Sequence, residues 1–234
     1  MIGPKLERAR QVLASAKADG RNLYEHEAYQ MVSELAPELV PEHRYARNLA
    51  EAEAAFGQMP KPVVMKVVSR GILHKSDVGG VVLGIDDLDK CRKAWEKLQD
   101  AARSAGAPFE GALVVSQAPS GFEVIVGAMR DKEFGPVVMV GPGGILVEMI
   151  KAPTFFVAPV QRHLVTDGLS QGTLGRLLEG VRGGQPLDKE AVGRAVEVVS
   201  DLMCSFPEIS EIDLNPVVAY PTGCKVLDAR IVLA

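Results

Sequence analysis

The chain has 234 residues, of which 47% are hydrophobic and 24% are charged. These proportions are typical of a globular protein and exclude a disordered or collagen-like chain. The formal net charge is −4, so the sequence gives no overall reason to expect DNA or RNA as a partner. The length is sufficient for one large domain or for two lobes that share an interface.

The cysteines and the apolar segments bear on location. Cys91, Cys204 and Cys224 are widely spaced and form no C-x-x-C pair, which predicts neither a disulfide framework nor a zinc site. This pattern fits a reducing cytoplasm. No stretch approaches the ~20 consecutive apolar residues that span a bilayer, and the first residues lack the apolar core of a secretory signal. We therefore expect a cytoplasmic protein with no membrane contact.

Residues 1–110 are predicted to form helices together with one hairpin. Apolar residues at helical spacing predict helices over 5–18, 22–35 and 49–56 and another that begins after Asp86 or Asp87. Asn22 is the expected cap of the second helix, and Trp95 is expected in the core. Segments 60–69 and 81–85 read as strands that pair around the loop 71–80.

Residues 111–234 are predicted to begin with strands and to end with a strand pair. The predicted strands are 112–116, 123–129, 136–140, 145–150, 211–220 and 225–232. The close spacing of the first four favours an antiparallel meander. Helices are expected over 166–180 and 188–205, and Gly141-Pro-Gly-Gly is interpreted as a sharp turn rather than a phosphate nest. Helices with antiparallel strands indicate an α+β protein.

Lys66 interrupts the predicted strand 60–69. A strand with apolar residues on both faces is usually buried, and a buried ammonium needs an anion, which a polyphosphate would supply. The alternative is that Lys66 points outward from an edge strand. The residues alone leave both interpretations open.

The loop 71–80 combines glycines with basic and hydroxyl side chains. Gly79 and Gly80 free backbone N–H groups, and Lys75 adds an ammonium, so the loop resembles a flap over phosphates, although it is not a Walker A sequence. The neutral imidazole of His74 is a competent nucleophile toward a phosphoryl group, and Lys75 beside it should help to keep it unprotonated. The alternative is a solvated loop histidine without a role.

Polar residues alternate along the predicted strand 211–220. Glu211, Asp213 and Asn215 should point to one face, and Asp228 on the next strand lies opposite them if a hairpin closes around residues 221–224. Such oxygen ligands with open positions suit Mg²⁺ when substrate phosphates complete its shell. The alternative is a polar sheet face with cross-strand hydrogen bonds.

Five motifs in this order resemble the ATP-grasp beta subunit of ADP-forming acyl-CoA synthetases, a group related to succinyl-CoA synthetase. They are Val64-Met-Lys-Val-Val, Leu73-His-Lys-Ser-Asp, Gly121-Phe-Glu-Val-Ile-Val-Gly, Phe134-Gly-Pro-Val-Val-Met-Val-Gly-Pro-Gly-Gly-Ile and Glu211-Ile-Asp-Leu-Asn-Pro-Val. The resemblance covers about residues 22–232. It implies an ATP-grasp fold of α+β class, in which the nucleotide binds between the antiparallel-rich sheets of two lobes, 22–110 and 111–234. Residues 1–21 would form a helical extension.

The resemblance also implies a reaction and its partners. In this family a phosphoryl group passes between ATP or ADP and histidines, so that a carboxylic acid and CoA are interconverted with acyl-CoA. The chain would work with Mg²⁺ and a separate CoA-binding alpha subunit in an alpha2beta2-type assembly. The alternatives are another ATP-grasp carboxylate ligase that forms an acyl phosphate directly, and a catalytically silent subunit that senses nucleotide.

The resemblance assigns roles residue by residue. His74 matches the phosphoryl carrier, and Asp213 matches the acid that orients the phosphohistidine. Asn215 and Asp228 match Mg²⁺ ligands. The implied nucleotide-binding residues are Lys66, Lys75, Gly79, Gly80, Val115, Ser116, Gln117 and Glu123. One departure is the segment 152–156, where Phe156 stands at a position at which many members of the family carry arginine.

Overall fold

The computed structural model describes residues 6–144, 153–180 and 185–234. The chain divides into two compact units. One consists of Tyr24–His26 and Pro41–Pro119 and is called the four-stranded unit below. The other consists of Glu27–Val40, Ser120–Ala234 and the residues before Tyr24, as far as the structure describes them, and is called the six-stranded unit.

The four-stranded unit has an antiparallel sheet of order β1-β4-β2-β3. Its strands are β1 (His43–Ala46), β2 (Val63–Val68), β3 (Val81–Ile85) and β4 (Gly111–Ser116). Strands β2 and β3 pair as the predicted hairpin, and β2 also pairs with β4. Every residue of β2 is therefore buried, because the strand has neighbours on both edges and side chains packed on both faces.

Helices α3 (Leu49–Gln58) and α4 (Leu88–Ser104) pack against this sheet. Asp87 caps α4 by accepting a hydrogen bond from the backbone N–H of Lys90 at 2.7 Å, which confirms one of the two expected caps. Trp95 belongs to the hydrophobic core, as expected, and packs edge-on against Phe109. The predicted core position of Trp95 is thus confirmed.

The six-stranded unit has an antiparallel sheet in which β10, β8, β5, β6 and β7 follow one another and β9 pairs with β8. Its strands are β5 (Phe122–Asp131), β6 (Gly135–Pro142), β7 (Thr154–Val157), β8 (Ile209–Ala219), β9 (Cys224–Val226) and β10 (Ala229–Leu233). The expected meander is correct for β5 and β6 but wrong for β4, which pairs with β1 and β2 in the other sheet. The predicted strand 145–150 lies outside the described residues.

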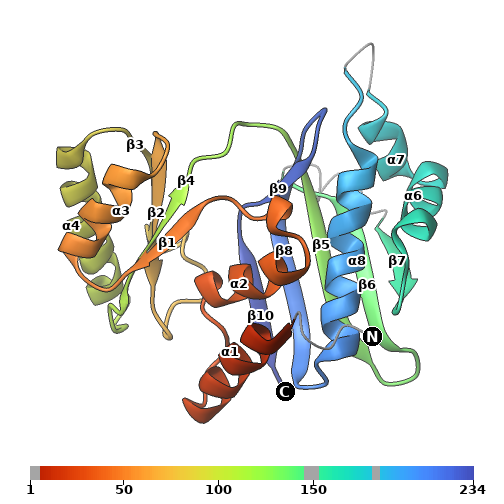
Figure 1. Cartoon of the computed structure of the whole chain (residues 1–234), viewed down its shortest axis with the longest axis horizontal. Helices are drawn as coiled ribbons and strands as arrows, with labels where there is room; N and C mark the ends of the chain where they lie inside the picture. Colours follow the sequence, from red (N-terminus) through yellow and green to blue (C-terminus); the bar gives the residue numbers. More distant parts are fainter. Residues whose placement is uncertain (1–5, 145–152, 181–184) are drawn as a thin grey trace. The chain divides into compact units, whose positions relative to one another are not determined.

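The helices of this unit are α1 (Glu7–Ala18), most of α2 (Glu25–Leu35), α6 (Arg162–Gln171), α7 (Thr173–Leu178) and α8 (Lys189–Ser205), with a 3₁₀ turn at Pro37–Leu39. Helix α8 runs along the sheet across β5, β6 and β8 (Figure 1). The single helix expected over 166–180 is wrong, because the backbone is extended at Gly172 and a new helix begins there. At Gly175 a Cβ would lie 2.1 Å from the carbonyl oxygen of Leu169, so this turn requires glycine.

Two smaller expectations are also corrected. Helix α2 begins at Glu25, and Asn22 does not cap it; its Oδ1 instead accepts a hydrogen bond from the N–H of Leu233 at 3.1 Å. The strand predicted over 225–232 is interrupted by Leu227 and Asp228, which separate β9 from β10. Among the described residues, no helix combines the length and the apolar character needed to cross a membrane.

Candidate functional site

Lys66 lies in the interior of the four-stranded sheet, which excludes the interpretation that it points outward from an edge strand. Lys66 is 7% exposed, and its backbone lies opposite Leu113 on β4 and Val81 on β3. The anion that this buried ammonium needs is supplied by the protein: Nζ of Lys66 lies 2.5 Å from Oε1 of Glu25. A buried charge is tolerated when it is paired and hydrogen-bonded, and Glu25 provides both.

Glu25 binds a second lysine as well. Its other oxygen, Oε2, lies 3.0 Å from Nζ of Lys75, and the Glu25 side chain is 2% exposed. Burial by itself would raise the pKa of the Glu25 carboxyl, but the ammonium groups of Lys66 and Lys75 outweigh burial and hold that pKa below its usual value. Glu25, Lys66 and Lys75 are called the Glu25 cluster below, and its carboxylate is shared by two ammonium groups.

The turn that carries Lys75 is closed by backbone hydrogen bonds and docked onto β2. The N–H of Gly80 donates to the carbonyl oxygen of Lys75 at 2.7 Å, and the N–H of Val67 donates to the carbonyl oxygen of Gly80 at 2.8 Å. A Cβ at Gly80 would lie 2.5 Å from Cγ1 of Val67, and Gly79 has a φ of +70°. Both glycines are therefore needed for the shape of this turn.

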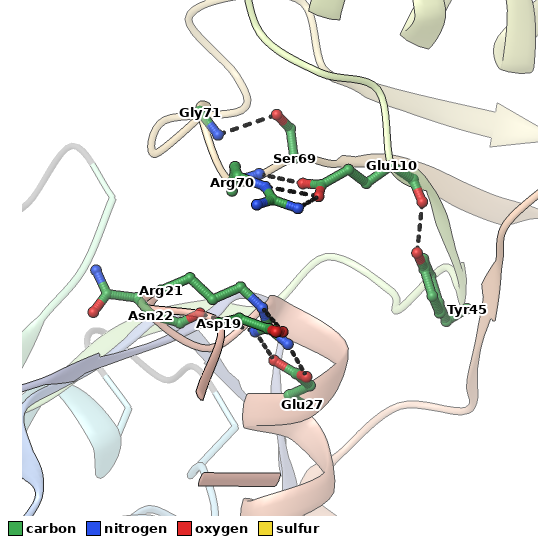
Figure 2. Close-up of polar contacts among 9 residues, drawn as sticks. All are labelled: Asp19, Arg21, Asn22, Glu27, Tyr45, Ser69, Arg70, Gly71 and Glu110. Atoms are coloured by element: carbon green, nitrogen blue, oxygen red, sulfur yellow. Dashed lines mark hydrogen bonds and ion pairs between the residues drawn. The ribbon is translucent and has the colours of Figure 1, made fainter. Parts of the chain in front are cut away.

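His74 immediately precedes the closed turn, and its side chain is exposed. On the other side of it, the chain is held at Arg70, whose guanidinium and backbone N–H bind the carboxylate of Glu110 at 2.6–2.9 Å. Figure 2 shows this pair, with the N–H of Gly71 turned to the hydroxyl of Ser69. His74 thus lies between two fixed points of the backbone.

The backbone of Glu110, the partner of Arg70, is itself bound to the sheet. The carbonyl oxygen of Glu110 accepts a hydrogen bond of 2.5 Å from the hydroxyl of Tyr45 on β1 (Figure 2). Burial would raise the pKa of the Glu110 carboxyl, but its hydrogen bonds from Arg70 outweigh burial and lower it. Glu110 therefore stays charged at neutral pH, and the fixed point at Arg70 persists.

The residues expected to meet adenine lie at the end of β4. Val115 is buried and pairs with β1 and β2. The N–H groups of Ser116 and Gln117 donate to the carbonyl oxygens of Glu42 and Pro62, at 2.8 and 3.1 Å. The side chain of Gln117 accepts a hydrogen bond from the N–H of Gly84 at 2.7 Å. Within the four-stranded unit these amide groups are thus already bonded.

Glu123 lies on β5, where the end of β6 closes over it. The N–H of Gly143 donates to the carbonyl oxygen of Glu123 at 2.7 Å. Gly144 has a φ of +58°, and a Cβ there would lie 2.6 Å from Oε2 of Glu123. The glycines after β6 therefore form a tight turn around an exposed carboxylate, which agrees with the turn interpretation of this segment.

The polar residues of β8 alternate as expected. Ile212 and Leu214 are buried, whereas Glu211 and Asp213 are half-buried and Asn215 is exposed. Asn215 and Asp228 are neighbours, since the N–H of Asn215 donates to the carbonyl oxygen of Asp228 at 3.1 Å. The predicted closure of the chain around residues 221–224 is thus confirmed.

A cation also lies on this face. Arg230 on β10 is paired with Asp213, and its Nη2 binds Oε1 of Glu211 at 2.7 Å. Glu211, Asp213, Asn215, Asp228 and Arg230, called the polar row below, therefore include one cation beside three acidic residues. Side chains two residues apart in a strand point to the same face, so Arg230 could have been expected beside Asp228 from the sequence.

The polar row was tested for its fit to a divalent cation. Among the described residues, no group of three or more His, Cys, Asp or Glu side chains could hold a metal ion. Asn215 and Asp228 offer one amide and one carboxylate at adjacent backbone positions. Mg²⁺ keeps several waters and is commonly bound by one or two carboxylates together with substrate phosphates, so this sparse set fits it when a nucleotide completes the shell.

The chain is similar to known proteins in both sequence and structure. A model of the ATP-grasp domain matches residues 14–233. The chain is 39% identical over 231 residues to "Acetate--CoA ligase [ADP-forming] I subunit beta" of Pyrococcus furiosus. The alignment covers 98% of this chain and 99% of that protein.

Several solved structures are similar over nearly the whole chain. Dinucleotide forming acetyl-coenzyme A synthetase 1 of Ca. Korarchaeum cryptofilum, in complex with coenzyme A, Ca-AMPCP and HgCl+, gives a TM-score of 0.91 at 39% identity and covers 97% of this chain and 100% of that chain. The same synthetase with coenzyme A and Mg-AMPPCP has its phosphohistidine segment pointing towards the nucleotide-binding site; the TM-score is 0.83 at 38% identity, with 96% and 99% covered. The chain therefore belongs to the ATP-grasp family, in the group that contains the beta subunits of ADP-forming acetate–CoA ligases.

Proposed function

We propose that this chain is the nucleotide-binding beta subunit of an ADP-forming acyl-CoA ligase, and that His74 carries the phosphoryl group between ATP or ADP and a separate CoA-binding alpha subunit. One observation carries the proposal: His74 is exposed between two anchored points of the backbone, directly before Lys75, one of two lysines that share the Glu25 carboxylate. The similarity to a relative named as a beta subunit, over nearly the full length of both chains, supports it.

The Glu25 cluster suits the binding of polyphosphate. Its two ammonium groups attract an anion, and their low exposure strengthens that attraction relative to water. We assign the phosphates of ATP or ADP to Lys66, Lys75 and the backbone of Gly79 and Gly80. Val115, Ser116, Gln117 and Glu123 are assigned to the rest of the nucleotide.

The proposed chemistry is a transfer from oxygen to nitrogen. In the direction that consumes ATP, the lone pair of one imidazole nitrogen of His74 forms a bond to the γ-phosphorus. The bond between that phosphorus and the bridging oxygen breaks, and ADP leaves with the electron pair. Asp213 is proposed to accept a hydrogen bond from the other ring nitrogen, which would orient the imidazole and stabilise its positive charge.

Asn215 and Asp228 are the residues proposed to hold Mg²⁺. When bound, the ion would neutralise phosphate charge as it develops during transfer. The net reaction would interconvert a carboxylic acid, CoA and ATP with acyl-CoA, ADP and phosphate. We further propose an alpha2beta2-type assembly in the cytoplasm, which accords with the free state of Cys91, Cys204 and Cys224.

Labelling tests the proposal. The chain is incubated with Mg²⁺ and γ-labelled ATP, with and without its CoA-binding subunit, and protein-bound label is examined for the acid lability and base stability of phosphohistidine. We expect label on the parent and on His163→Ala, an exposed-histidine control, and its loss in His74→Ala. Label that persists in His74→Ala contradicts the assignment. Nucleotide binding without any label points instead to direct acyl-phosphate formation or to a sensing role.

A further inference from the structure

Glu25 is a charged residue that the sequence did not single out, and it connects the two lysines. Its carboxylate receives Lys66 on one oxygen and Lys75 on the other, with side-chain exposures of 2% for Glu25, 9% for Lys66 and 15% for Lys75. Removal of one partner from a buried ion pair leaves an uncompensated charge. One carboxylate therefore contributes to holding both ammonium groups.

The carboxylate itself is fixed by the fold. Glu25 is the first residue of α2, where the partial positive charge of a helix N-terminus favours a carboxylate. Lys66 is held by β2, which is buried along its whole length. Glu25 and Lys66 thus form a rigid pair, and Lys75 is the member of the cluster that belongs to a loop.

Lys75 transmits this position to the loop. It follows His74 in the chain, and its carbonyl oxygen closes the turn by accepting the hydrogen bond from Gly80. The side chain of Lys75 is bound to Glu25 at 3.0 Å. Glu25 therefore fixes the residue after His74, while the Arg70–Glu110 pair fixes the chain before it.

We propose that Glu25 is a positioning residue for phosphoryl transfer: through Lys75 it holds the loop so that His74 is presented beside Lys66. The inference rests on the proposed function and adds a residue to it. Without the carboxylate, the loop loses its side-chain anchor after His74, where only the backbone hydrogen bonds of the turn remain, and it keeps the anchor before His74. Because the remaining cluster becomes more positive, nucleotide binds at least as tightly, and the loss falls on the transfer step.

The test uses the full chain and four variants. Glu25→Gln removes the carboxylate, and Lys75→Met removes the loop anchor while the Glu25–Lys66 pair remains. The double variant completes a cycle. Glu53→Gln is the matched control, since it breaks a surface ion pair of 2.6 Å with Arg92 in the same unit. For each we measure hydrogen exchange of the amides of Gly79 and Gly80, the affinity for ATP and the rate at which His74 is phosphorylated.

The expected result is a separation of binding from transfer. Exchange at Gly79 and Gly80 should become about tenfold faster in Glu25→Gln and Lys75→Met but not in Glu53→Gln. Phosphorylation of His74 should slow by about tenfold to a hundredfold in either single variant. ATP affinity should not fall in Glu25→Gln. Both substitutions break the same contact, the ion pair between Glu25 and Lys75. The double variant should therefore be no slower than the slower single variant.

Other outcomes overturn the proposal. Unchanged exchange in both single variants shows that the ion pair does not anchor the loop. Effects on phosphorylation that multiply in the double variant show that Lys75 acts on the nucleotide rather than through Glu25. If Glu25→Gln does not fold, the exchange at Gly79 and Gly80 in Lys75→Met still decides whether the ion pair anchors the loop. Absence of label from the parent overturns the proposed function and the catalytic part of this inference, and the exchange rates then report only on anchoring.

Discussion

The Glu25 cluster and the polar row both contain charged side chains beside a sheet, but the two sets differ in how far they are buried. β2 is buried on both faces, so Lys66 needs a counter-charge from within the protein and finds it in Glu25. Along the polar part of β8, Ile212 and Leu214 are buried, whereas Glu211, Asp213 and Asn215 remain accessible to solvent. Burial therefore decides whether a charged residue contributes to the stability of the fold as well as to the chemistry of the site.

The largest effect is expected at Glu25, because its substitution should damage stability as well as transfer. Glu25→Gln leaves two ammonium groups without their carboxylate, and the loss of one partner of a buried ion pair costs about 3–5 kcal/mol. Urea unfolding at neutral pH should show a loss of this size. A loss below about 1 kcal/mol is the range of exposed ion pairs. Such a result would mean that the Glu25 cluster contributes no more to stability than the polar row does.

The pH dependence of the same measurement supplies its control. The folded chain holds the pKa of Glu25 below that of an unfolded carboxyl, about 4.3. The stabilisation is therefore present above that pH and is lost as pH falls through the lower folded pKa. The gap between the parent and Glu25→Gln should be constant near neutrality and should shrink below about pH 4. A gap that does not change with acidification would assign the loss to packing rather than to charge.

The next largest effect is expected at Asp213, and there it should fall on activity alone. Asp213→Asn keeps the size of the side chain and removes the charge proposed to stabilise the His74 imidazolium. Loss of an orienting acid costs about 10²–10⁴-fold in rate. Phosphorylation of His74 should slow by that factor, while urea unfolding should be unchanged because Asp213 is only half-buried. A large loss of stability in Asp213→Asn would contradict the view that the accessible residues of the polar row contribute little to the stability of the fold.

The sequence predicted the parts of the fold that depend on local pattern. Helix α8 and the β2–β3 hairpin have clear periodicity and were placed correctly. The strands β1 and β7 were missed because each has only four residues, too few for a pattern to emerge. The partner of β4 was predicted wrongly because sheet membership depends on contacts between segments far apart in the chain.

The candidate site shows the same limit. The alternation that exposes Asp213 and Asn215 can be read from one strand. That Lys66 is buried could also be expected from its apolar neighbours. Its partner could not, since Glu25 is 41 residues away and lies in a helix that contains other acidic residues, Glu27 and Glu34. Only the fold shows which of these acids meets the lysines.

A smaller effect is expected at the glycines of the closed turn, where the two positions differ. Gly80→Ala places a methyl group 2.5 Å from Cγ1 of Val67 and 2.9 Å from the carbonyl oxygen of Lys75. Such overpacking costs about 1–3 kcal/mol. Gly79→Ala has open space and suffers only from its φ of +70°, which costs about 1 kcal/mol. Thermal unfolding of both variants should rank them in this order, and the reverse order would mean that Gly80 is not packed on β2.

The smallest effect is expected at Glu211. It binds Arg230 at 2.7 Å, but the two side chains are 45% and 35% exposed, so water and salt screen the pair. Glu211→Gln should therefore cost no more than about 1 kcal/mol in unfolding free energy, and added salt should abolish the difference. The geometry of this pair closely resembles that of Glu25 and Lys66, with N–O distances that differ by little. If Glu211→Gln were as damaging as Glu25→Gln, distance rather than burial would determine what an ion pair contributes, and the polar row would be structural.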